Sequence, residues 1–399
     1  MSESMPHMTE TTGRTHKPLS ILYVITGLFG GGAELMLYRL LSRLDRTRFT
    51  PQVVSLLDHG PISRKIQALG IPVRSLGMKR GIPNPAVVLR LVRWLRQDPP
   101  DMMQTWMYHA DLVGGLAAQL VGNIPVAWGI RNSDLSSETS SRLTHLTVKT
   151  CAILSRWLPD RIVCCSEAAR QVHTAIGYAA EKMVVIPNGY ELETFRPDSG
   201  ARASVRKGLA ISEDATIVGM IARFDPQKDH RTFIRAAQLL HYDKPDAYFL
   251  LCGNEVTWEN QQLVRWIDEA GIRTRCHLLG RRDEEIPLLT AALDIASLSS
   301  AYGEGFPNVV SEAMSCGVPC VVTDIGDAAL IVGEAGIVVP PRNPDALAAA
   351  WRTMLEMGSE SRRHMGIAAR QRIKERFDIK EIAGRYEYLF EELAHSARA

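Results

Sequence analysis

Residues 299–314 read SSAYGEGFPNVVSEAM and are the most informative stretch of the sequence. The apolar run 295–298 before it predicts a β-strand, and Pro307 is suited to the first turn of a following helix. Glu304 lies in the loop between glycines, where it can meet sugar hydroxyls, and Glu312 lies one to two turns inside the helix, where it can accept both hydroxyls of a ribose. Glu312 lies among apolar neighbours, where a carboxylate without a function is costly to bury, and neither acid has an obvious basic partner.

The same strand-to-helix rhythm continues on both sides of this stretch. Such alternation predicts a parallel sheet covered by helices on both faces, and the pattern occurs twice along the chain. The first set of expected strands is 21–25, 52–56, 73–76, 102–105, 126–130, 161–165 and 183–186. The second set is 216–221, 248–251, 276–279, 295–298, 320–322 and 336–339, and helices are expected at 345–356, 359–375 and about 380–393.

We therefore expect an α/β protein with two doubly wound, Rossmann-like domains that face each other across a cleft. Residues 1–18 are expected to form a disordered tail, 19–190 the first domain and 191–377 the second. A C-terminal helix at about 378–396 is expected to pack back on the first domain. Ligands bind at the carboxyl ends of the strands in such sheets, so the active site is expected between the domains.

Composition excludes several classes of protein. The 399 residues are 46% hydrophobic and 23% charged, as in globular proteins, and no apolar run reaches the ~20 residues of a membrane-spanning helix. The seven cysteines show no metal-binding spacing, so we expect a reduced, cytoplasmic protein. The net charge of +2 divides into +8 up to Tyr190 and −6 after it, which suggests different partners for the two halves and disfavours nucleic acid.

Two further segments follow a predicted strand and precede a predicted helix. Gly30, Gly31 and Gly32 let backbone N–H groups approach a phosphate or sugar, although a flexible turn would look the same. Arg223 and Lys228 can hold a diphosphate, with solvated loop cations as the alternative.

Together these segments resemble the retaining glycosyltransferases of family 4, which have the two-domain GT-B fold. The resemblance is carried by the Glu-x7-Glu block from Glu304 to Glu312 with the Ala-Met-Ser-Cys-Gly-Val-Pro that follows it. It is also carried, in order, by Gly30 to Glu34, His109-Ala110-Asp111, Ser166-Glu167, Pro187-Asn188-Gly189 and the Arg223 and Lys228 pair.

The resemblance implies a role for each of these residues. Arg223 and Lys228 would grip the donor diphosphate, Glu312 the ribose and Glu304 the transferred sugar, while His109 would reach the reacting sugar. Further donor-binding residues would be Gly30, Gly31, Gly32, Gly253, Phe306, Pro307, Asn308 and Val309, and acceptor-side candidates Arg131, Ser166 and Asn188. No metal or cofactor is expected, because cations and helix ends would hold the diphosphate of a donor that we expect to be UDP-linked.

The chain also departs from the family pattern. Residues 324–329, Asp-Ile-Gly-Asp-Ala-Ala, replace a paired glycine and a glutamate, and Leu298 stands where a proline is common. The loop contact at 324–329 is therefore in question, as is donor specificity.

The acceptor is expected to be a glycan or a lipid-linked molecule in cell-surface or exopolysaccharide synthesis. Two basic segments with tryptophan, 84–97 and 141–158, could contact an anionic membrane peripherally, at its inner face, or could simply be packed helices with a solvated rim. The alternatives to transfer are a nucleotide-sugar epimerase and a catalytically silent sugar-nucleotide binding protein of the same fold.

Overall fold

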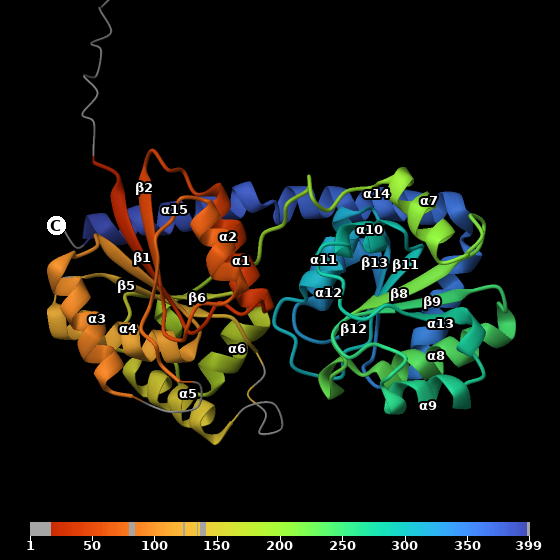
Figure 1. The fold of residues 1–399 in the computed structure, drawn as a ribbon, viewed down its shortest axis with the longest axis horizontal. Helices are drawn as coiled ribbons and strands as arrows, with labels where there is room; N and C mark the ends of the chain where they lie inside the picture. The colour runs from red at the N-terminus through yellow and green to blue at the C-terminus, as the bar shows by residue number, and fades with distance from the viewer. Residues whose placement is uncertain (1–16, 80–83, 123, 134, 136–140, 397–399) are drawn as a thin grey trace, which may run out of the picture.

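The computed structural model describes residues 17–79, 84–122, 124–133, 135 and 141–396. Within them the chain forms two parallel sheets with helices on both faces (Figure 1). The α/β fold expected from the alternation of strands and helices is confirmed. The tail expected at 1–18 lies outside the described residues, apart from Lys17 and Pro18.

The first domain is a seven-stranded sheet with the order β3-β2-β1-β4-β5-β6-β7. Its strands are β1 (Leu19–Ile25), β2 (Phe49–Ser55), β3 (Val73–Ser75), β4 (Met102–Trp106), β5 (Val126–Ile130), β6 (Arg161–Cys164) and β7 (Met183–Val185). Its helices are α1 (Gly32–Arg43), α2 (Pro61–Ala68), α3 (Ala86–Gln97), α4 (Tyr108–Val121), α5 (Arg142–Leu154) and α6 (Glu167–Ala175). Helices α3 to α6 cover one face of the sheet, and α1 and α2 the other.

The second domain repeats this order in six strands, β10-β9-β8-β11-β12-β13. The strands are β8 (Ile217–Ile221), β9 (Tyr248–Cys252), β10 (Cys276–Leu278), β11 (Ile295–Leu298), β12 (Cys320–Thr323) and β13 (Gly336–Val339). The α-helices are α7 (Ser199–Gly208), α8 (His230–Asp243), α9 (Gln261–Glu269), α10 (Ile286–Ala291), α11 (Asn308–Ser315), α12 (Ala328–Val332), α13 (Pro344–Glu356) and α14 (Gly358–Arg376), followed by α15 (Ile379–Ser396). A short 3-10 turn, η2 (Pro226–Lys228), precedes α8.

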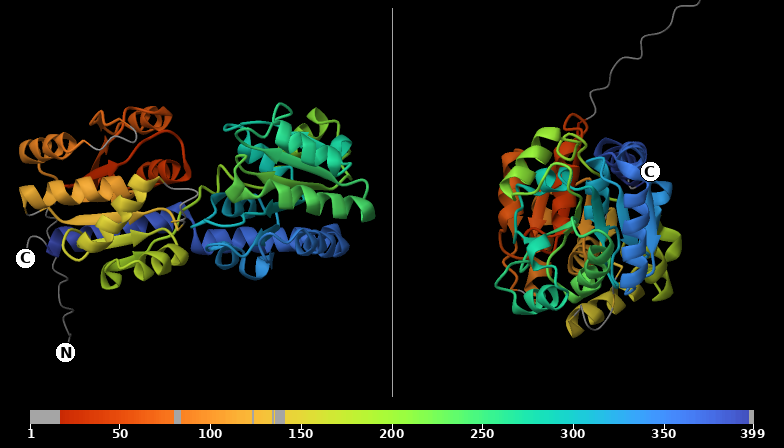
Figure 2. Two further views of the ribbon diagram at one scale, coloured as in Figure 1. Left: turned by 90° about the horizontal axis from the view of Figure 1, so that it is seen from below. Right: turned by 90° about the vertical axis from the view of Figure 1, so that its right-hand side faces the viewer.

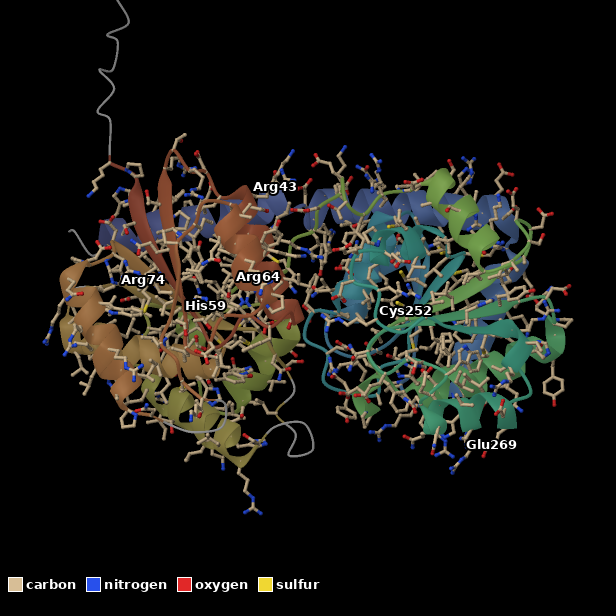
Figure 3. The ribbon with its side chains drawn as sticks, in the orientation of Figure 1. Arg43, His59, Arg64, Arg74, Cys252 and Glu269 are labelled. Carbon is tan, nitrogen blue, oxygen red and sulfur yellow. The ribbon has the colours of Figure 1, made fainter. Side chains whose placement is uncertain are left out.

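The chain crosses between the domains twice, at neighbouring points. Tyr190 N donates to Phe377 O at 2.9 Å, and Ile379 N donates to Tyr190 O at 3.1 Å. Helices α14 and α15 consequently run almost end to end along one side of both domains (Figure 1 and Figure 2). The seven cysteines are all free and buried; Cys252, the last residue of β9, is labelled in Figure 3.

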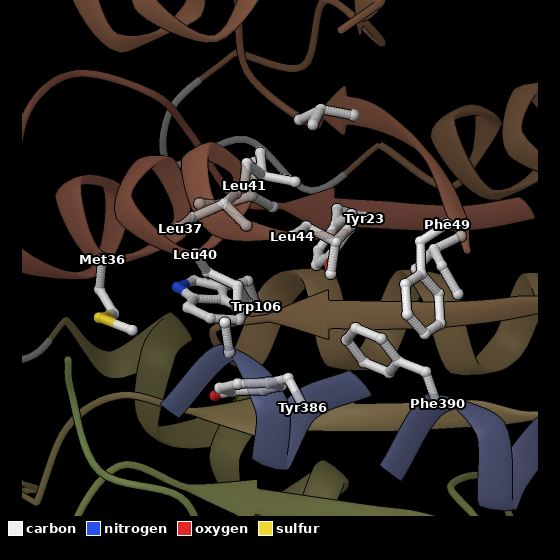
Figure 4. Packing of buried hydrophobic residues seen from close by; sticks show 14 of the residues in the cluster. Tyr23, Met36, Leu37, Leu40, Leu41, Leu44, Phe49, Trp106, Tyr386 and Phe390 are labelled. Carbon is white, nitrogen blue, oxygen red and sulfur yellow. The ribbon is translucent and has the colours of Figure 1, made fainter. Parts of the chain in front are cut away.

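Helix α15 completes the core of the first domain. Phe390 meets the rings of Tyr23 and Phe49 edge-on, each with 6.1 Å between ring centres, and Tyr386 lies beside Trp106 (Figure 4). Burying aromatic side chains of this size contributes strongly to stability, which explains why the last helix returns to the first domain.

Candidate active site

A cavity of about 1000 Å³ lies between the two domains. Its walls are the segments that follow β1, β5 and β6 in the first domain and β8, β9, β10 and β11 in the second. These are the carboxyl ends of parallel strands, where ligands bind in open α/β sheets. The volume suits a ligand of nucleotide-sugar size.

Most residues predicted from the sequence meet at this cavity. Those that line it are Gly30, Gly31, Gly32, Arg131, Asn188, Arg223, Lys228, Gly253, Glu304, Phe306, Pro307, Asn308 and Val309. His109, Ser166 and Glu312 are not among the described residues of its lining.

Arg223 and Lys228, the residues predicted to bind phosphate, both line the cavity. Each is also bound to a neighbouring side chain of the second domain. Lys228 Nζ forms an ion pair with Glu304, whose Oε1 also accepts a hydrogen bond from Ser300 Oγ at 2.6 Å. Arg223 donates to Asp225 at 3.1 Å and to Gln227 at 3.0 Å. The expectation that Glu304 has no basic partner is wrong, because the turn before α8 brings Lys228 against it. The Lys228 ammonium would have to be shared between Glu304 and a bound phosphate.

Glycines let the cavity walls approach each other closely. A Cβ on Gly32, the first residue of α1, would lie 2.8 Å from Asn308 Nδ2, and Gly30 has a φ of +109°. A Cβ on Gly253 would lie 2.0 Å from Ala222 O, so only glycine allows β8 and β9 to end side by side here. The first domain thus offers the cavity the N-terminus of α1 with its backbone N–H groups, together with the side chain of Arg131.

Helix α11 directs its N-terminus at the cavity and is tied to the first domain by its first residue. Asn308 Oδ1 accepts hydrogen bonds from Asn188 Nδ2 at 2.9 Å and from Tyr190 OH at 2.6 Å. The first N–H groups of a helix have no partner within it and carry partial positive charge. An anionic ligand in the cavity would therefore meet these donors together with Arg223 and Lys228.

Glu312 lies one turn further along α11 and is buried. It accepts a 2.6 Å hydrogen bond from Arg39 Nη2, on α1 of the first domain. The expectation that Glu312 lacks a basic partner is also wrong, since the partner comes from the other domain. Burial disfavours the charged Arg39 guanidinium, but the neighbouring Glu312 carboxylate outweighs it and the pKa of Arg39 is raised.

Ser166 acts as a helix cap. Its Oγ accepts from Ala169 N at 2.9 Å at the start of α6, and it is fully buried. The first two N–H groups of α6, those of Glu167 and Ala168, donate at 2.8 and 2.9 Å to the carboxylate of Asp327 in the second domain. Asp327 lies within the segment 324–329 that departs from the family pattern, and here it joins the two domains through charge-assisted hydrogen bonds.

Arg131 and His109 follow neighbouring strands of the first domain. The Arg131 guanidinium lies 3.5 Å from the centre of the Trp106 ring and donates to Asn188 Oδ1 at 3.3 Å. His109 is the second residue of α4 and is half-buried, and burial lowers its pKa, so the imidazole is neutral near pH 7.

Several residues were not predicted from the sequence, among them the charged residues Arg39, Arg281, Arg282 and Asp327. Arg281 and Arg282 line the cavity just after β10, and the same rule that selected Arg223 and Lys228, cations beyond a strand end, could have found them. No local signal marks Arg39 or Asp327, because each acts on a residue of the other domain.

The described residues contain neither a cluster that could hold a metal ion nor a helix that could cross a membrane. In these parts of the chain, no group of three or more histidine, cysteine or acidic side chains is close enough to share a metal ion. None of the described helices combines the length and the apolar character that crossing a bilayer requires.

Solved structures with the same fold extend over nearly the whole chain. HepE from Anabaena, crystallised in complex with UDP-glucose, superposes with a TM-score of 0.81 at 24% identity and covers 94% of this chain and 100% of HepE. Sucrose-phosphate synthase from Thermosynechococcus elongatus gives a TM-score of 0.77 at 20% identity, again covering 94% of this chain and 100% of its own. The GT-B architecture expected from the sequence is confirmed by these likenesses.

Sequence relatives and family models agree with the architecture. The Escherichia coli UDP-Gal:alpha-D-GlcNAc-diphosphoundecaprenol alpha-1,3-galactosyltransferase is 27% identical over 330 residues, which are 80% of this chain and 83% of that protein. The D-inositol 3-phosphate glycosyltransferase of Mycolicibacterium gilvum is 32% identical over 270 residues, which are 64% of this chain and 58% of that protein. The model of Glycosyltransferase Family 4 matches residues 30–194, and that of Glycosyl transferases group 1 matches residues 201–372. The chain therefore belongs to the family 4, group 1 glycosyltransferases with the GT-B fold.

Proposed function

We propose that this glycosyltransferase moves a sugar, with retention of the anomeric configuration, from a UDP-sugar to a glycan or lipid-linked acceptor in cell-surface or exopolysaccharide synthesis. The observation that carries the proposal is the convergence of Arg223, Lys228 and the α11 N-terminus on one interdomain cavity. The names of similar proteins support the finer points: the Escherichia coli relative is named for UDP-Gal and a diphosphoundecaprenol-linked acceptor, and HepE was crystallised with UDP-glucose.

The proposed reaction breaks the bond between the sugar C1 and the donor phosphate oxygen. The acceptor hydroxyl attacks C1 from the same face, and its proton passes to the departing phosphate oxygen, so that no side-chain nucleophile is needed. Arg223 and Lys228 oppose the negative charge that grows on the leaving UDP. Glu304 orients the transferred sugar, Glu312 the ribose, and neutral His109 serves the reacting sugar from the first domain. Arg131, Asn188 and Ser166 belong to the acceptor side, where Ser166 acts through its cap on α6.

No metal takes part in this proposal. The cations and helix N-termini at the cavity neutralise the diphosphate in its place. We also propose that the protein works in the cytoplasm, in peripheral contact with the inner face of an anionic membrane.

Of the two basic segments, α5 and the turn after it carry the better membrane face. Leu146, Ile153 and Trp157 are 62%, 65% and 67% exposed there, beside Lys149 and Arg156. On α3, by contrast, Trp94 is half-buried beneath Arg74, which is labelled in Figure 3, and Arg90 donates to Leu76 O at 2.7 Å.

A screen of nucleotides and nucleotide sugars by thermal stabilisation tests the donor. A true donor at 100 times its Kd should stabilise the fold by ~2.7 kcal/mol. NMR of the product made with that donor should show the same anomeric configuration as the donor. The reaction should proceed equally well with EDTA and with magnesium. An inverted product, a free epimer without acceptor, or activity that EDTA abolishes and magnesium restores would each contradict the proposal.

A further inference from the structure

The Arg39–Glu312 ion pair connects the two domains beside the candidate site. Arg39 lies on α1 and Glu312 on α11, with 2.6 Å between Nη2 and Oε1. Their side chains are only 11% and 12% exposed. A buried pair of this kind is retained only when its geometry is good, because both charges have lost their water.

Arg39 is fixed by more than its charge. Its guanidinium carbon lies 5.3 Å from the centre of the Tyr190 ring and 5.8 Å from that of Phe195, both in the segment that connects the domains. Guanidinium groups stack favourably on aromatic faces at such distances. Arg39 thus has one preferred position, which the crossover segment defines.

The Arg39–Glu312 pair is connected to Asn308, at the end of α11 that faces the cavity. Glu312 and Asn308 are four residues apart and share one face of the helix. Asn308, which lines the cavity, accepts from Tyr190 OH at 2.6 Å, and the same Tyr190 ring stacks on Arg39. Arg39 and Tyr190, which contact each other, therefore hold Glu312 and the start of the helix respectively.

We propose that Arg39 is a positioning residue for the donor nucleoside, supplied by the acceptor-side domain. It holds one oxygen of the Glu312 carboxylate, which leaves the other oxygen to accept hydrogen bonds from the ribose hydroxyls. Because Arg39 and Glu312 lie on different domains, the orientation of Glu312 depends on a contact that the other domain supplies. The proposal rests on the assignment of Glu312 to the ribose in the proposed function.

The experiment compares three variants in the full chain. Arg39→Met removes the charge and keeps the apolar stem, Arg39→Lys restores a cation, and Arg43→Met is the matched control. Arg43, labelled in Figure 3, lies one turn further along α1 and also reaches the connecting segment, with Nη2 at 3.2 Å from Glu193, but it is more exposed. Affinity for UDP and for 2′,3′-dideoxy-UDP is measured by calorimetry, and kcat and donor KM are measured with the donor that the screen identifies.

Arg39→Met should weaken UDP binding about tenfold, the change that corresponds to ~1.4 kcal/mol, and leave binding of 2′,3′-dideoxy-UDP unchanged. Donor KM should rise with little change in kcat, since an interaction made equally in ground and transition states is lost. Arg39→Lys should recover part of the preference for UDP, and Arg43→Met should match the wild type.

Glu312→Gln separates the two ways in which the idea can fail. If Glu312→Gln weakens UDP binding while Arg39→Met does not, the positioning role is wrong and the ribose assignment stands. If neither variant changes the preference for UDP over the dideoxy analogue, the ribose assignment itself fails. Adding Arg39→Met to Glu312→Gln should cost no further affinity, because residues that act as one unit are not additive, and a full additive loss would overturn the proposal.

Discussion

The two domains share one strand order but differ in what they offer to the cavity. After its first strand the first domain presents Gly30 to Gly32 and the backbone of α1, whereas the second presents Arg223 and Lys228. Four of the five lysine or arginine side chains that line the cavity within the described residues belong to the second domain: Arg223, Lys228, Arg281 and Arg282, with Arg131 from the first.

This local distribution is opposite to the overall charge of the two halves. The half up to Tyr190 carries +8 and the remainder −6. Many basic side chains of the first half, such as those of α3 and α5, lie on its outer surface. The net charge of a domain therefore governs its long-range attraction to charged partners. The ligand of the site depends instead on which cations lie just beyond the strand ends.

The largest expected effect tests the chemistry assigned to the second domain. Arg223→Ala or Lys228→Ala should lower kcat by ~10²-fold or more, since each removes charge opposite the leaving group. Arg273→Ala is the control, because Arg273 is an exposed arginine of the same domain that pairs with Asp268 at 2.8 Å, away from the cavity. Wild-type rates in both cavity variants would remove the phosphate assignment.

The next prediction concerns the outer surface of the first domain. Changing Lys149 and Arg156 to Gln should weaken sedimentation with anionic vesicles by ~30-fold, at ~1 kcal/mol for each cation near such a surface. The loss should fade as salt rises and should spare transfer to a soluble acceptor.

The matched variant changes Arg90, Arg93 and Arg96 on α3 to Gln. Arg90 already donates to a carbonyl oxygen of its own domain, so this change should have the smaller effect. A larger loss of vesicle binding in the α3 variant would indicate that α3, and not α5, contacts the membrane. Wild-type protein that ignores anionic vesicles at low salt would end the membrane proposal.

The smallest expected effect is a difference between the two domains in how their stability depends on pH. Burial lowers the pKa of His173 in the first domain and of His230 in the second to about 4. Each contributes stability that is complete above the ordinary value of 6.5 and is lost as pH falls toward 4. In the first domain, burial also raises the pKa of Asp111 to about 7, so that this carboxyl binds its proton more tightly in the folded state and opposes the loss in acid.

The second domain should therefore lose protection against hydrogen exchange sooner on acidification. At pH 5.5 the stability lost through His230 amounts to about 1.4 kcal/mol. Protection factors of β8 and β9 should fall relative to those of β1 and β4 between pH 7 and 5.5, and His230→Asn should abolish the difference. Equal protection of both sheets in the wild type would contradict this account.

The strands and most of the site could be predicted because their signals are local. Apolar runs between turn residues mark each strand, and Gly30, Arg223, Lys228 and Glu304 are each recognisable from their place between a strand and a helix. Parallel sheets bring the carboxyl ends of their strands to one edge, so that order along the chain is enough to place these residues in one cavity.

The pairing of charged residues across the two domains could not be predicted from the sequence. Arg39 and Glu312 are 273 positions apart, and Asp327 caps a helix whose first residue is 160 positions earlier. The sequence around one member of each pair gives no sign of its partner, because each contact depends on how the two sheets face each other. Local sequence signals were enough to predict two Rossmann-like domains and the loops that line the cavity between them. The pairing of Glu304 with Lys228 and of Glu312 with Arg39 was decided by packing, since a buried carboxylate is stable only beside the cation that the fold places within hydrogen-bonding distance.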